Sequence, residues 1–94
     1  GVTWKKIPSF GTKGSAEALA IDPTNQNRIA VSSVLWSDGA PGKIFLSSDA
    51  GLTWTEVTSN LPAGAGAAAM TFSPDGKYLY ISRYAGSVYR LKFN

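Results

Sequence analysis

The side chains that most often perform enzyme chemistry are scarce in this sequence of 94 residues. It contains no histidine and no cysteine, which excludes the commonest general base, the commonest metal ligand and any thiolate reaction. Hydrolysis of a glycosidic bond would need two carboxylates flanking the bond, roughly 5–9.5 Å apart. The sequence offers six carboxylates for that role: Glu17, Asp22, Asp38, Asp49, Glu56 and Asp75.

Two copies of one pattern must position these side chains. Residues 1–7 recur as 51–57, 19–23 as 70–74, 28–32 as 78–82, and 42–45 as 86–89. Four matched segments in the same order indicate an internal repeat. We therefore divide the chain, a single domain, into a first unit of residues 1–50 and a second unit of residues 51–94.

Each unit is predicted to form four short strands, and no segment has helical periodicity. In the first unit the strands are Thr3–Ile7, Glu17–Asp22, Arg28–Ser33 and Lys43–Ser48; in the second they are Thr53–Thr58, Ala67–Ser73, Tyr78–Arg83 and Ser87–Phe93. Four strands in a unit of about 40–50 residues are typical of a β-propeller blade. Small residues at 15–18 and 64–69 suit the strands nearest the axis, although the second run also reads as a flexible linker.

Residues 47–54 read Ser-Ser-Asp-Ala-Gly-Leu-Thr-Trp and fit the pattern Ser-x-Asp-x-Gly-x-Thr-Trp. This motif resembles the Asp-box, or BNR repeat, of the β-propellers in sialidases, xyloglucanases, sortilin-type receptors and photosystem assembly factors. The resemblance implies a structural role, on the face opposite the ligand site, for Ser47, Asp49, Gly51, Thr53 and Trp54. We expect Asp49 to accept hydrogen bonds within the turn, Gly51 to allow positive φ, and Trp54 to pack over the turn.

The first unit carries only the second half of this motif, at Gly1, Thr3 and Trp4. Because Asn94 aligns with the residue before Gly51, the boundary between units falls inside the motif. This register predicts two four-stranded antiparallel blades, of which one is completed by strand exchange: Thr3–Ile7 becomes the outer strand of a neighbouring copy's second blade.

Two blades alone cannot close a propeller and would leave sheet edges and apolar faces uncovered. We expect either a parent chain that supplies the missing blades or a cyclic homo-oligomer, with a trimer or tetramer favoured. The second expectation describes an engineered or excised two-blade fragment that assembles with itself.

The loops on the face opposite the motif are where a propeller would bind a ligand. Trp36, in a long polar loop, could stack on a sugar ring, or instead pack over the blade edge. Only Glu17 and Asp38 could share this face as a carboxylate pair. The candidate ligand face comprises Trp36, Asp38, Tyr84, Arg83 and Glu17.

Catalysis finds little further support in the sequence. Strand positions keep Arg28, Arg83 and Arg90 apart, so they do not match the arginine triad that a sialidase-like site implies, and no xyloglucanase-like aspartate motif is present. No metal site and no cofactor are predicted, because there is no metal-ligand cluster and no phosphate-binding loop.

The net charge of +3 comes from scattered basic residues, which argues against nucleic acid as a partner. No apolar stretch approaches the ~20 residues of a membrane span, so we expect a soluble protein whose compartment stays open and whose parent could be secreted. The leading hypothesis is a non-catalytic, self-assembling propeller module. The alternatives are a fragment of a carbohydrate-active glycoside hydrolase, and a face that binds glycan or protein.

Overall fold

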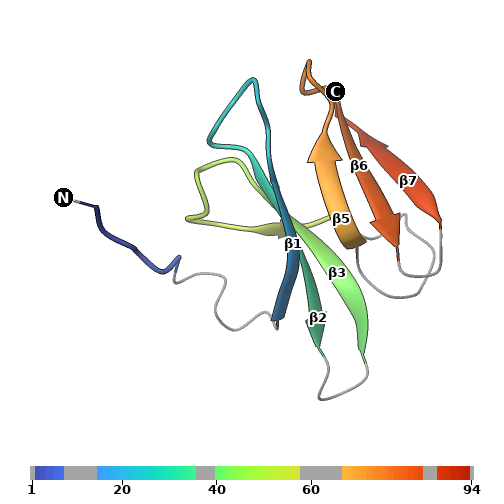
Figure 1. Cartoon of the computed structure of the whole chain (residues 1–94), viewed down its shortest axis with the longest axis horizontal. Helices are drawn as coiled ribbons and strands as arrows, with labels where there is room; N and C mark the ends of the chain where they lie inside the picture. The colour runs from blue at the N-terminus through green and yellow to red at the C-terminus, as the bar shows by residue number, and fades with distance from the viewer. Residues whose placement is uncertain (1, 8–14, 36–39, 58–66, 84–86, 94) are drawn as a thin grey trace.

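The computed structural model describes residues 2–7, 15–35, 40–57, 67–83 and 87–93. Its regular structure consists of two antiparallel β-sheets, and the described ranges contain no helix (Figure 1). The first sheet has the order β1 (Ser15–Ile21), β2 (Ile29–Leu35), β3 (Ala40–Ser47) and β4 (Thr55–Glu56). The second has the order β5 (Ala67–Phe72), β6 (Tyr78–Arg83) and β7 (Val88–Lys92). The prediction of an all-β chain is confirmed at this level.

The first sheet crosses the boundary between the two repeat units. Strands β1 to β3 belong to the first unit, whereas β4 belongs to the second and pairs with β3 through Phe45 opposite Glu56 and Leu46 opposite Thr55. In the second sheet β7 pairs with β6 only. Among the described residues the second sheet therefore lacks the fourth strand that its counterpart has.

In the single chain residues 2–7 adopt no regular structure, so the predicted strand Thr3–Ile7, which needs a neighbouring copy, stays a prediction. They lie on the far left of Figure 1, beyond β1 and away from the second sheet. A strand needs a neighbouring strand to satisfy its backbone N–H and C=O groups. Strand β4 begins later than the predicted Thr53, because the Thr53 N–H is bonded to a side chain of the preceding turn; the predicted end, Thr58, lies outside the described residues.

The repeat is visible in the local irregularities of the sheets as well as in their order. The pairing of β1 with β2 shifts between Ala16 and Ala18, and that of β5 with β6 shifts between Ala67 and Ala69. These residues lie at corresponding places in the two units, at the start of β1 and of β5. The small residues predicted nearest the axis thus coincide with a β-bulge in both units, and residues 67–69 form a strand rather than a linker.

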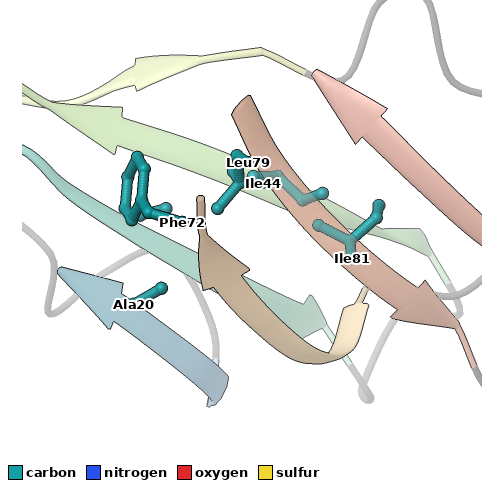
Figure 2. Close-up of a cluster of buried hydrophobic side chains, with 6 residues drawn as sticks. Ala20, Ile44, Phe72, Leu79 and Ile81 are labelled. Atoms are coloured by element: carbon teal, nitrogen blue, oxygen red, sulfur yellow. The ribbon is translucent and has the colours of Figure 1, made fainter. Parts of the chain in front are cut away.

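One face of each sheet packs against the other to form the core (Figure 2). Ala20, Ala30 and Ile44 come from the first sheet, and Phe72, Leu79 and Ile81 come from the second. Leu79 is 1% exposed, and burying a side chain of its size stabilises a fold by about 1.5–3 kcal/mol.

Candidate functional site

The turn between β3 and β4 is held by two side chains, Ser47 and Asp49. The Ser47 Oγ accepts hydrogen bonds from the backbone N–H groups of Asp49 and Gly51, at 3.3 and 2.8 Å, and donates to Asp49 Oδ1 at 2.8 Å. Asp49 accepts two more, from the N–H of Thr53 at 2.9 Å and from its hydroxyl. The turn thus uses the Ser, Asp, Gly and Thr of the motif in one network.

Backbone conformation explains the glycine of this turn. Gly51 has φ of 93°, in the region that favours glycine, and Ala50 before it has φ of 63°. A Cβ placed on Gly51 would lie 3.1 Å from Ile7 Cδ1 and 3.5 Å from Trp54 Cζ2. The Trp54 ring therefore lies over the turn, and the side chain of Ile7 rests on the same spot.

The hydrogen bonds from the Thr53 hydroxyl and N–H, with that from Ser47, lower the pKa of Asp49 to about 2. A carboxylate held in this way stays ionised and uses its oxygens to hold the turn. It is a poor general acid or base near neutral pH, where a catalytic pKa would have to lie.

A second charged turn lies beside the first. Asp22 directly follows β1, is fully buried, and accepts hydrogen bonds at its Oδ1 from the N–H and hydroxyl of Thr24, both at 2.8 Å. Its other oxygen pairs with the Arg28 guanidinium, at 2.7 Å from Nη2. Burial raises the pKa of Asp22, but the bonds from Thr24 and Arg28 outweigh it and lower the pKa overall. The Ala50 N–H donates to Asn27 O at 2.9 Å, which joins this turn to the motif turn.

Arg28 ties the two sheets together, a role that sequence analysis missed. Its Nη2 donates to the carbonyl of Gly76, in the turn between β5 and β6. Its guanidinium lies 4.0 Å from the ring centroid of Phe93 and 5.6 Å from that of Phe72. An Arg placed six residues after an Asp across a turn hints at the ion pair, but not at the partners in the second unit.

The predicted ligand face is only partly within the described residues. Trp36, Asp38 and Tyr84 lie outside them. Arg83 ends β6 with its guanidinium 5.7 Å from the Tyr89 ring, and Glu17 is half-buried on β1. Within the described ranges the predicted ligand face is thus represented only by Arg83 and Glu17.

The partial motif at the start of the chain is placed very differently from its full counterpart. Gly1 lies outside the described residues, Thr3 is exposed, and Trp4 is 99% exposed. Trp54, at the corresponding place, is half-buried against Gly51. The tryptophan of the motif thus packs over a turn at Trp54, where Ser47 and Asp49 precede it, and stays exposed at Trp4.

The hollow between the sheets is mostly apolar. It is lined mainly by Ile44, Val57, Leu79 and Ile81, with Arg90 as its charged neighbour.

Within the described ranges no three His, Cys, Asp or Glu side chains gather to hold a metal ion. No helix there is long and apolar enough to cross a membrane.

Comparisons with known proteins assign no family. No family model matches the chain, and a search of curated proteins finds no match.

Proposed function

We propose that the chain is a non-catalytic Asp-box β-propeller module that assembles with itself into a ring-shaped homo-oligomer. One observation carries the proposal. The four-stranded sheet takes its outer strand, β4, from the second repeat unit, while β7 has no outer neighbour and residues 2–7 have no strand partner among the described residues. Residues 3–7 of a second copy would complete the second sheet as β4 completes the first.

The repeat predicts the register of this strand exchange. Thr55 and Glu56 correspond to Lys5 and Lys6, and Phe45 and Leu46 correspond to Tyr89 and Arg90. The exchanged strand should therefore place Lys6 opposite Tyr89 and Lys5 opposite Arg90.

Like charges that face each other across strands repel, and salt screens the repulsion. Because salt would screen the repulsion between Lys5 and Arg90, assembly should be stronger at high salt than at low salt. The exchange also gives up the contact of Ile7 with Gly51 in its own chain, which the new strand contacts must outweigh.

Backbone hydrogen bonds provide a sharp test of the exchange. In the first sheet the Val57 N–H donates to Ile44 O at 2.9 Å. Because such bonds involve alternate residues of an antiparallel strand, the N–H of Thr55 faces β3 and that of Glu56 faces away. By correspondence, the N–H of Lys5 should face β7 and that of Lys6 should not.

The experiment compares Lys5→Pro with Lys6→Pro, since each loses one positive charge and one N–H. Light scattering or sedimentation should give the unmodified chain a mass of several times 9.9 kDa, favouring three or four copies. Lys5→Pro should lose the assembled species, whereas Lys6→Pro should keep it, because proline is tolerated where the N–H faces solvent. A monomeric unmodified chain, or equal assembly of both variants, would overturn the proposal.

A further inference from the structure

The net positive charge of the protein comes from the stretch that forms the second sheet. Residues 67–94 contain one acidic residue, Asp75, and four basic residues: Lys77, Arg83, Arg90 and Lys92. In residues 1–66 basic and acidic residues are equal in number. Asp75 is held in the turn before β6, where it accepts hydrogen bonds from the Ser73 hydroxyl at 2.7 Å and from the Lys77 N–H at 3.0 Å. The strands of the second sheet therefore carry no carboxylate.

Two of these basic residues gather on one face of β7, the outermost strand on the right of Figure 1. Arg90 and Lys92 lie two residues apart, are exposed, and stand opposite Tyr80 and Tyr78 of β6. The Arg90 guanidinium lies 4.6 Å from the ring centroid of Tyr78. Because Tyr78 stands opposite Lys92, this cation–π contact draws the guanidinium along the strand towards Lys92. Among the described residues no carboxylate pairs with either of them.

Strand exchange adds a third positive charge to this face. In the register derived above, Lys5 of a neighbouring copy stands opposite Arg90, and the uncharged Thr3 stands opposite Lys92. Side chains of directly opposite residues lie on the same face of a sheet, with Cβ atoms about 4.5–5.5 Å apart. Assembly therefore brings Lys5, Arg90 and Lys92 together at the contact between the exchanged strand and β7, which we call the joint.

The first sheet has no such cluster of charges. The places that correspond to the three basic residues carry uncharged side chains: Leu46, Ser48 and Thr55. The three charges thus meet only where two copies join. Because like charges on adjacent strands repel each other, the joint is weakened unless an anion lies between them.

We propose that Lys5 of one copy and Arg90 and Lys92 of the next form a binding site for a phosphate group, which holds the two copies together. Guanidinium and ammonium groups bind phosphate oxygens through charge-assisted hydrogen bonds. The inference rests on the proposed function, because Lys5 reaches the site only through strand exchange. It goes beyond that function by making assembly depend on a ligand.

The experiment measures the protein concentration at which half of the chain is assembled. Sedimentation gives this concentration in sodium chloride and in sodium phosphate of the same ionic strength, so that general screening is equal. A ligand that binds only the assembled form stabilises it by a factor of one plus the ratio of its concentration to its Kd. At phosphate concentrations ten times Kd, we therefore expect half-assembly at a protein concentration about tenfold lower or less.

Lys92→Gln and Lys43→Gln form a matched pair of variants. Lys92→Gln removes one charge of the site without touching the exchanged strand. In chloride it should assemble at least as readily as the unmodified chain, because less repulsion remains, and it should lose most of the tenfold response to phosphate. Lys43→Gln removes a charge from the first sheet, where Lys43 pairs with Glu56 at 3.4 Å. This control should keep the full response.

The outcomes separate the two proposals. If the unmodified chain assembles equally well in both salts, or if Lys92→Gln keeps the response, the phosphate site is refuted while the strand exchange stands. If the unmodified chain is a monomer in both salts, the proposed function fails and the site fails with it. Far-ultraviolet circular dichroism checks that both variants fold.

Glycerol phosphate, tested in the same way, distinguishes two sources of the phosphate group. An effect equal to that of inorganic phosphate supports a site that takes phosphate esters as well as the free ion. An effect of inorganic phosphate alone supports a site for the free ion.

Discussion

Gly76 offers a direct test of how the turns of the two sheets are joined. It has φ of 73°, and a Cβ added there would lie 2.6 Å from Thr24 Oγ1 and 2.8 Å from Asp22 Oδ1. Carbon atoms do not approach oxygens so closely, and Asp22 and Thr24 are fixed by their own hydrogen bonds. Gly76→Ala must therefore displace the cluster that pairs with Arg28.

Two contributions give the magnitude. A left-handed backbone costs an L-residue roughly 1–2 kcal/mol, and overpacking a fixed site costs roughly 1–3 kcal/mol more. We expect Gly76→Ala to lower the free energy of unfolding by about 3 kcal/mol. In a domain of this size that lowers Tm by about 12 °C or more, since each kcal/mol corresponds to roughly 4–8 °C.

Gly51→Ala is the matched control. Gly51 has φ of 93°, further from the usual left-handed value of about +57°, so its backbone cost is at least as large. Its nearest neighbour is the end of the Ile7 side chain, at 3.1 Å, which can move. Gly51→Ala should therefore cost only about 1–2 kcal/mol, the backbone contribution.

The assay is thermal unfolding followed by circular dichroism, with both variants at one protein concentration. The difference between the Tm decrease of Gly76→Ala and that of Gly51→Ala measures how firmly Asp22 and Thr24 are held in place. If both variants lose the same stability, then Asp22 and Thr24 move aside easily. That result would refute the inference that their hydrogen bonds hold them rigidly against Gly76.

Two further predictions concern Ser32, whose removal should stabilise the fold, and Asp49, whose contribution to stability should depend on pH. Ser32 is fully buried and its Oγ has no hydrogen-bond partner among the described residues; Ser32→Ala should raise the free energy of unfolding by about 1 kcal/mol in urea denaturation, and a loss would contradict this reasoning. Because the pKa of Asp49 is lowered from 3.8 to about 2, its stabilisation is complete above the unfolded pKa and is lost as pH falls towards the folded value. Between about pH 4 and pH 2 the Tm of Asp49→Asn should therefore fall less than that of the unmodified chain; parallel curves would contradict the assignment.

The strands and turns that depend on residues close together in the sequence could be predicted. The strand Tyr78–Arg83 was found with its exact bounds, because β-branched and aromatic residues between turn residues leave few alternatives. The hydrogen bonds of Asp49 reach residues two and four positions away, so the spacing within residues 47–54 predicts which groups can meet.

Contacts between distant residues could not be read in this way. The bond from Arg28 to Gly76 spans 48 positions, and it exists because the faces of the two sheets pack together. Trp4 and Trp54 occupy the same position of the sequence pattern, but they differ in burial. Trp54 follows a complete turn and packs over it, whereas Trp4 does not.

The sequence by itself determined the repeat, the all-β class and the chemistry of the motif turn, because each depends on periodicity or on groups a few residues apart. Only the tertiary structure decided that β4 completes the first sheet while β7 has no outer neighbour among the described residues. Those outcomes depend on which strands and faces are within reach of one another in a single chain, and that is a property of packing in three dimensions.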